Sequence, residues 1–277
     1  MAYTQDGRRL VVKTPLGKDV LLLTGFSGRE AISQPFLFQL ECVAENATKI
    51  PFENLLGEKV TIEISLPGGS KRWINGVCQR VAQGARDATF TRYLLDLVPE
   101  AFLLSRKTQS RIFQQISIPD ILKKVLKGVD VKWEIQGTFQ PRNYCVQYRE
   151  SDFALASRLM EEEGIYYFFK HKDGSHTMVV ANTPGSHSDI SPGSSKLIFE
   201  AVGGGTREED RVNAWEKAQE LRSSKVMLWD HLSIAKITSS ANSEEIRVVP
   251  GLMRAGERRQ PKRSKSRAAS FTSWRRR

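Results

Sequence analysis

The chain of 277 residues is poor in the residue types that build common catalytic and metal sites. Its three cysteines, Cys42, Cys78 and Cys145, lack the paired spacing of a metal knuckle or a disulfide framework, so we expect each to pack as a small apolar side chain. No apolar run is long enough to cross a bilayer, and no apolar segment comes after the arginine pair near the start. We therefore expect neither a membrane helix nor a secretory signal.

Motifs for nucleotide binding and nucleophilic catalysis are also missing. The glycine run 203–205 is followed by Thr206 without the lysine of a phosphate-binding loop, which favours a linker. Ser27 lies between Gly25 and Gly28, but the spacing is not that of a nucleophile elbow, so it is not a candidate nucleophile. We propose no catalytic, cofactor-binding or metal-binding residue from the sequence.

Two of the four histidines lie close together in the sequence. His171 and His176 flank a predicted hairpin turn and can approach each other across it. A zinc site would need further converging ligands, and Asp173 lies in the turn itself, so we interpret the pair as polar hairpin residues. His187 and Asp189 lie in a predicted loop and support no site.

The net charge of +11 is concentrated at one end of the chain. Residues 251–277 contain ten Lys or Arg and one acid, which gives +9 and leaves +2 for all the residues before them. Such a segment could bind nucleic acid or an acidic membrane surface, and Phe271 and Trp274 could stack on bases. It has no apolar periodicity, so its composition predicts disorder.

Residues 9–100 read as a series of short strands, which suggests a small antiparallel barrel or sandwich. The expected strands are separated by glycine and proline at positions including Pro15, Gly17, Gly25, Gly28 and Pro35. They comprise residues 10–12, 20–23, 36–43, 60–64, 72–77 and 93–98.

After residue 100, the spacing of the apolar residues changes to that of a helix. Ser117 and Asp120 form a capping-box-like pair before an apolar helical face that ends at Gly128. A strand around Trp133 and a hairpin over 168–180, with its Asp173-Gly174 turn, predict a compact α+β region.

Residues 143–169 carry the most information. Tyr144, Val146 and Tyr148 alternate with polar residues and Cys145, the period of a half-buried strand. Ser151 then caps a helix whose apolar stripe is Phe153, Ala156, Leu159 and Met160, and Gly164 ends it before an aromatic strand. Glu161, Glu162 and Glu163 lie in the last turn, where the helix dipole disfavours anions. They are either a solvated acidic corner or are compensated by a basic surface elsewhere in the fold or on a neighbouring subunit.

The run QYRESDFALASRLMEEEGIYYFF resembles the Vgr-type spike proteins of type VI secretion, and is similar to late-control D and baseplate hub proteins of contractile phage tails. Further segments resemble this family in the same order, over roughly residues 10–231: LLLTGFSGREAISQPFLFQLECVAE, NLLGEKVTIEI and AWEKAQELRSSKVMLWDH. The residues after His231 do not resemble this family.

The resemblance implies an α+β, mainly β fold: an antiparallel barrel-like hub domain with an inserted small α+β domain and an incomplete second barrel. We expect the first barrel at 1–105, completed by 183–205, and the insertion at 106–182. The truncated start of the second barrel is expected at 206–237, and a basic disordered tail at 238–277.

The function that the resemblance implies is that of a non-catalytic hub, a homotrimer that caps the tube and supports the puncturing needle. Its expected partners are the tube protein and spike-tip or effector proteins, with no small-molecule substrate and no nucleic acid. It would assemble in the bacterial cytoplasm and leave through the contractile apparatus. Two alternatives stay open: a truncated remnant that does not assemble, and a nucleic-acid-binding protein acting through its tail.

We further hypothesise that residues after about Ile237 are a shifted-frame or truncated end without selected function. The abrupt change to an Arg- and Ser-rich composition, in place of the expected barrel strands and valine–glycine needle, motivates this hypothesis.

Overall fold

The computed structural model describes residues 3–66, 69–187, 198–200, 211–212 and 214–217. Most described residues belong to one compact unit; the short parallel pair β12 (Ile198–Phe199) and β13 (Arg211–Val212) belongs to a second. The predicted second barrel at 206–237 lies mostly outside the described residues, and the predicted tail at 238–277 entirely so. No helix among the described residues is both long and apolar enough to cross a membrane.

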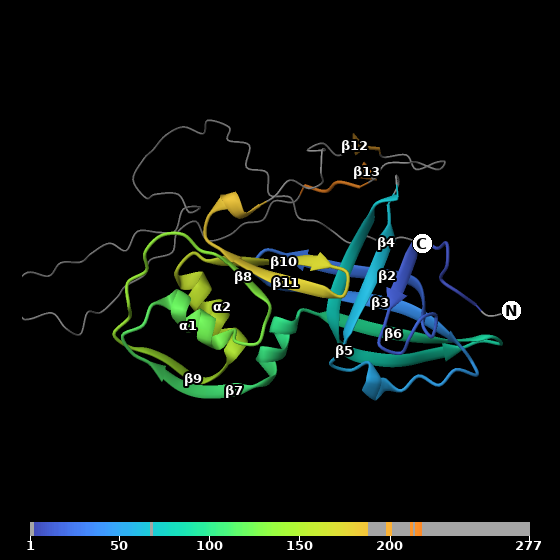
Figure 1. Cartoon of the computed structure of the whole chain (residues 1–277), viewed down its shortest axis with the longest axis horizontal. Coiled ribbons are helices and arrows are strands. Elements are labelled where there is room, and N and C mark those ends of the chain that lie inside the picture. The colour runs from blue at the N-terminus through green and yellow to red at the C-terminus, as the bar shows by residue number, and fades with distance from the viewer. Residues whose placement is uncertain (1–2, 67–68, 188–197, 201–210, 213, 218–277) are drawn as a thin grey trace, which may run out of the picture. The chain divides into compact units, whose positions relative to one another are not determined.

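A six-stranded antiparallel sheet in the order β1-β4-β5-β6-β3-β2 forms the first part of the chain (Figure 1). Its strands are β1 (Leu10–Lys13), β2 (Leu22–Ala31), β3 (Gln34–Glu45), β4 (Lys59–Ser65), β5 (Lys71–Arg86) and β6 (Phe90–Val98). This sheet confirms the predicted mainly β, antiparallel architecture. The short 3-10 helices η1 (Phe52–Asn54) and η3 (Glu100–Arg106) connect or follow these strands.

Gln5 bridges the two end strands of this sheet. Its side chain, only 3% exposed, accepts from Val12 N–H at 2.9 Å and donates to Val12 O at 3.1 Å, as a strand residue would. The same oxygen accepts from Leu23 N–H on β2 at 3.2 Å. One side-chain amide thus satisfies backbone groups that no neighbouring strand pairs at this point.

Gly25, Gly28 and Pro35 do not separate strands, contrary to the prediction. Gly25 follows a register shift within β2, and Pro35 lies in β3 beside the shift between Arg29 and Ala31. At Gly28 a Cβ would lie 2.0 Å from the Phe38 ring. These residues mark irregular pairing and close packing inside long strands, which glycine and a proline beside a bulge near the start of a strand permit.

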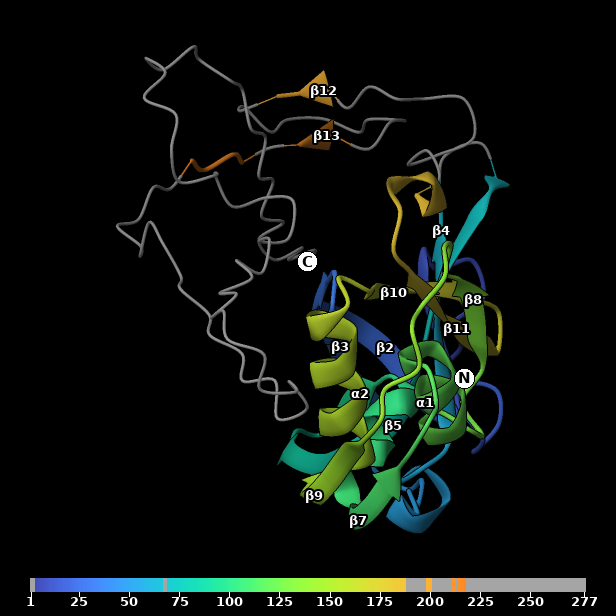
Figure 2. The ribbon, with the colours of Figure 1, turned by 90° about the vertical axis from the view of Figure 1, so that its left-hand side faces the viewer.

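The α+β part contains two helices, α1 (Ile118–Val125) and α2 (Asp152–Glu162), which lie side by side (Figure 2). A three-stranded sheet is formed by β8 (Val131–Glu134), β10 (Tyr166–Lys172) and β11 (Ser175–Ala181), with β11 central. A separate two-stranded ribbon pairs β7 (Thr108–Phe113) with β9 (Cys145–Ser151). The short 3-10 helix η4 (Pro184–Ser186) follows β11. The hairpin over β10 and β11 confirms the Asp173-Gly174 turn, in which Gly174 has φ 73°.

Local helix signals are confirmed only in part. Ser151 caps α2 by accepting from Ala154 N–H at 3.1 Å. Ser117 occupies the N-cap position of α1, but its hydroxyl donates to the Asp120 carboxylate at 2.6 Å and caps no backbone group. The predicted pairing of Ser117 with Asp120 is therefore confirmed, but the hydrogen bond joins the two side chains to each other and does not cap a backbone N–H group.

A continuous apolar core joins the six-stranded sheet to the α+β part. Phe36 of β3 meets Phe169 of β10 edge to face, with ring centroids 5.0 Å apart. Cys42, Cys78 and Cys145 are free and buried in this core, as predicted. Burial raises the pKa of the Cys42 thiol to about 12, so at neutral pH it is an apolar thiol. The domain boundaries at 105 and 182 stay a prediction.

Candidate functional site

The outer face of the β7–β9 ribbon carries the main group of exposed apolar side chains among the described residues. Ile112, Tyr144, Val146 and Tyr148 are 59%, 56%, 36% and 68% exposed. The sequence predicted the alternation along β9 but not which face is buried. The structure turns Cys145 and Gln147 inward, so the more apolar side chains point to solvent.

A buried polar cluster explains this orientation. Asp152, at the start of α2, accepts from Gln109 Nε2 at 2.9 Å and from Gln147 Nε2 at 2.8 Å, and forms an ion pair with Arg111. Arg111 Nε also donates to Gln147 Oε1 at 2.7 Å. Because a buried carboxylate requires such partners, the polar face of the ribbon must face the helix.

A bulge shapes the same face. Gln109 pairs with Glu150 and Arg111 with Gln147, so Tyr148 and Arg149 together oppose Ser110. Arg149 has φ 49° and its guanidinium lies 5.4 Å from the Tyr148 ring centroid. Bulges of this kind redirect side chains, and here both Tyr148 and Arg149 are exposed. Tyr and Arg are enriched at the energetic centres of protein interfaces.

The acidic turn of α2 is compensated from within the fold. Arg142 donates to Glu162 at 2.6 Å and to Glu163 at 2.7 Å, and Arg158 reaches Glu162 at 3.2 Å and Glu150 at 2.6 Å. Glu161 forms no ion pair within the part that the structure describes. For Glu162 and Glu163, the alternative of a compensating basic group is therefore confirmed.

His171 and His176 are directly paired across the hairpin, as predicted. Beyond this prediction, both rings contact the six-stranded sheet through Asn75. His176 is 4% exposed and its Nδ1 lies 2.8 Å from Asn75 Oδ1, whereas His171 Nδ1 lies 3.2 Å from Asn75 N. Asn75 is fully buried. The sequence did not indicate this role, because a single polar residue within a strand does not show which residues of other elements it contacts.

Other sequence candidates are not brought together. Ser27 lies within β2, where it pairs with Gln39. His187 stacks on Tyr166 at 5.3 Å between ring centroids, whereas Asp189 lies outside the described residues, as do 203–206. Within the described ranges, no three His, Cys, Asp or Glu side chains are placed to hold a metal ion.

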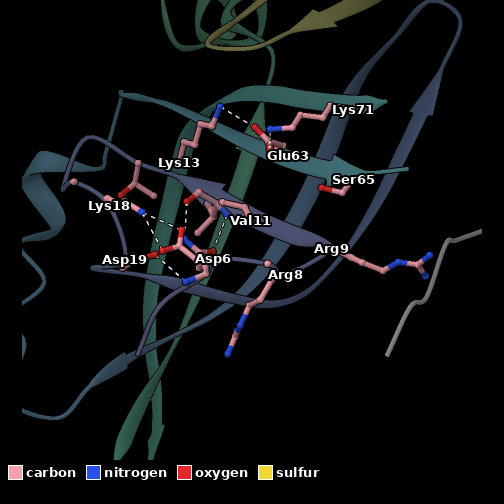
Figure 3. A pocket seen from close by; sticks show the side chains of 15 residues that line it. Asp6, Arg8, Arg9, Val11, Lys13, Lys18, Asp19, Glu63, Ser65 and Lys71 are labelled. Atoms are coloured by element: carbon pink, nitrogen blue, oxygen red, sulfur yellow. Dashed lines mark hydrogen bonds and ion pairs between the residues drawn. The ribbon is translucent and has the colours of Figure 1, made fainter. Parts of the chain in front are cut away.

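A pocket of about 670 Å³ lies beside β1 and β4, and Figure 3 shows its charged lining. Most of these charges pair with each other. Glu63 lies between Lys13 at 2.9 Å and Lys71 at 2.5 Å, and Lys18 pairs with Asp6 at 2.9 Å. Hydrogen bonds from Lys71 and then from Lys13 lower the pKa of Glu63 to about 2. Lys13 also reaches Asp173 in the hairpin turn at 2.7 Å, so this cluster links the sheet to the hairpin.

Comparison with known proteins identifies the family. A family model described as phage tail baseplate hub (GPD) matches residues 29–263. The chain belongs to this family. The match runs past His231, so the limit predicted for the resemblance was too early.

The curated relatives of this baseplate hub chain include spike proteins. It is 36% identical over 234 residues to the type VI secretion system spike protein VgrG1c of Pseudomonas aeruginosa, covering 83% of this chain and 32% of that protein. To VgrG1a of the same organism it is 38% identical, covering 81% of this chain and 35% of that protein. The chain thus spans about a third of the length of these relatives.

A solved structure supports the fold. An E. coli component of the type VI secretion system, described as similar to the T4 bacteriophage tail proteins gp27 and gp5, matches with a TM-score of 0.54. It shares 23% identity, and the match covers 70% of this chain and 50% of that one. The curled antiparallel sheet with its α+β part is therefore a tail-hub fold.

Proposed function

We propose that this baseplate hub chain is a structural, non-catalytic component of the spike of a type VI secretion, phage-tail-like apparatus. The observation that carries the proposal is the match of most of the chain to the hub family, together with 36–38% identity to secretion spike proteins. These relatives favour the hub over a nucleic-acid-binding protein or a remnant.

The structure is compatible with load bearing rather than turnover. One apolar core runs through the six-stranded sheet and the α+β part, and buried polar groups such as Asp152 with Gln147 and His176 with Asn75 pair inside it. Since packed cores resist deformation, such a body transmits force without a bond-making centre.

The proposed function also implies a particular assembly. We expect a homotrimer that caps the secreted tube and carries tip or effector proteins, assembled in the cytoplasm and exported through the apparatus. The outer face of the β7–β9 ribbon is the described surface best suited to a protein contact, because its apolar side chains are exposed and lie beside Arg149.

The test measures the molar mass of the purified chain by light scattering, and its co-elution with the tube protein of the same bacterium. The proposal predicts a mass three times that of the monomer and a complex with the tube protein. A soluble, folded monomer that binds neither itself nor the tube protein over the micromolar range would refute it.

A further inference from the structure

A buried chain of hydrogen bonds through His176 fastens the hairpin of β10 and β11 to the six-stranded sheet. Asn75 of β5 donates from Nδ2 to Thr61 Oγ1 at 2.8 Å, and its Oδ1 lies 2.8 Å from His176 Nδ1. On its other side, His176 Nε2 accepts from Glu100 N–H at 2.9 Å. The ring of His176 therefore lies between a strand of the sheet and the start of η3.

The directions of these bonds fix the protonation state of His176. A backbone N–H can only donate, so Nε2 must carry no proton towards Glu100. The proton of a neutral imidazole then lies on Nδ1, where it points at Asn75 Oδ1. Since Asn75 Nδ2 already donates to Thr61, the amide oxygen is the acceptor that this arrangement requires. A second proton on Nε2 would place two N–H groups face to face in a buried site.

The aromatic side chains around His176 would stabilise a protonated, positively charged ring very little. The His176 ring packs edge to face on Phe36, with centroids 5.5 Å apart, and also near Phe169 at 6.2 Å. The His171 ring, on β10, lies 6.2 Å from it and has its Nε2 3.3 Å from Glu30 Oε1 on β2.

Charges on the remaining elements act in both directions. Lys59 of β4, which pairs with Glu100 at 3.8 Å, disfavours a charged His176, as does His171; Asp130, before β8, favours it. Burial is the largest effect, and together these lower the pKa of His176 to about 4.

We propose that His176 is a pH-controlled latch, which holds the hairpin against the six-stranded sheet while its ring is neutral and releases it when Nε2 is protonated. The proposal does not depend on the proposed function. Because the folded pKa lies below the ordinary value of 6.5, the contribution to stability is complete above about pH 6.5 and is lost as the pH falls towards about 4.

The test uses the whole chain. At pH 7, nitrogen-15 NMR of the imidazole should find Nδ1 protonated and Nε2 unprotonated. As the pH is lowered below 6.5, hydrogen exchange corrected for its intrinsic pH dependence should show that the Glu100 amide and the hairpin amides open. The opening constant should rise by up to about tenfold for each pH unit below 6.5. Amides that pair β3 with β6 should stay protected, because release of the hairpin leaves that ladder intact.

Two variants control the result. His176→Gln keeps an acceptor for Glu100 N–H but cannot be charged, so its hairpin opening should be independent of pH in this range. His187→Gln removes a histidine that stacks on Tyr166 but takes no part in the chain of hydrogen bonds through His176, so the pH dependence of hairpin opening should match that of the natural chain.

Three results would overturn the proposal: an Nε2–H tautomer, protonation near pH 6.5 with the hairpin still protected, or the same pH-dependent opening in His176→Gln. If His176→Gln does not fold, the ring titration and the exchange profile of the unaltered chain decide the question without it.

Discussion

Strands β3 and β9 alternate in a similar way, but β3 buries its apolar face, whereas β9 exposes its more apolar face to solvent. In β3 the inward residues are apolar, among them Phe36, Leu40 and Cys42, and they fill the sheet's core. In β9 the inward residues are Cys145 and Gln147, whereas Val146 and Tyr148 face solvent. The difference shows that alternation predicts a strand, but the neighbouring element decides which face it buries.

The largest expected effect comes from a substitution on the buried apolar face of β3. Replacing Leu40 by Ala removes a fully buried side chain from β3 and leaves a cavity, because the surrounding sheet can relax only in part. We expect the free energy of unfolding to fall by about 2–5 kcal/mol. Urea denaturation measures it, with the partly exposed Leu37→Ala as the control on the same strand; equal losses for both would contradict the assignment of faces.

The next prediction tests the polar side. Asp152→Ala leaves Arg111, Gln109 and Gln147 without their shared acceptor beneath the ribbon. We expect a loss of about 3 kcal/mol, because breaking one partner of a buried pair leaves the other uncompensated. Asp152→Asn keeps one oxygen acceptor and should lose less. If both variants unfold at the urea concentration of the natural chain, the cluster does not determine the ribbon's orientation.

A smaller effect concerns Glu63, which bridges Lys13 and Lys71 at the surface of the sheet. Its folded pKa of about 2 lies below the ordinary value, so its contribution to stability is present above about pH 4.5 and is lost as the pH falls towards 2. Both lysines are nearly half exposed, and solvent screening reduces the contribution to about 1–2 kcal/mol.

Thermal unfolding as a function of pH measures this contribution. Glu63→Gln should flatten the acid limb of the stability curve, whereas Glu161→Gln, on an exposed carboxylate, should leave it unchanged. An unaltered acid limb in Glu63→Gln would exclude the bridge as its source.

The smallest effect is expected on the outer face of the ribbon. Tyr148→Ser removes a side chain that is 68% exposed, so the free energy of unfolding should change by no more than about 0.5 kcal/mol. If this face contacts another protein in the proposed assembly, the same variant should weaken that complex. A stability loss as large as that of Asp152→Ala would mean that Tyr148 packs in the fold.

Much of the fold could be predicted from local signals. Short β-rich runs located most strands of the sheet, although β2 runs from Leu22 to Ala31, well past the expected 20–23. The Ser151 cap, the apolar stripe and Gly164 located α2. Prediction failed where a residue's role depends on distant neighbours. The local sequence predicts a break at Gly28, because nothing in it indicates that Phe38 packs there, and it carries no signal for Gln5, whose partners lie on β1 and β2.

The mainly β character of the first part, the helix of residues 152–162 and the membership of the hub family were determined by the sequence alone, because periodicity and motif content are properties of consecutive residues. Only the tertiary structure decided that His176 is neutral and buried, that Arg142 compensates Glu162 and Glu163, and that Val146 and Tyr148 face outwards. Each of these depends on a donor, acceptor or charge brought from another element, and burial makes such partners obligatory without naming them in advance.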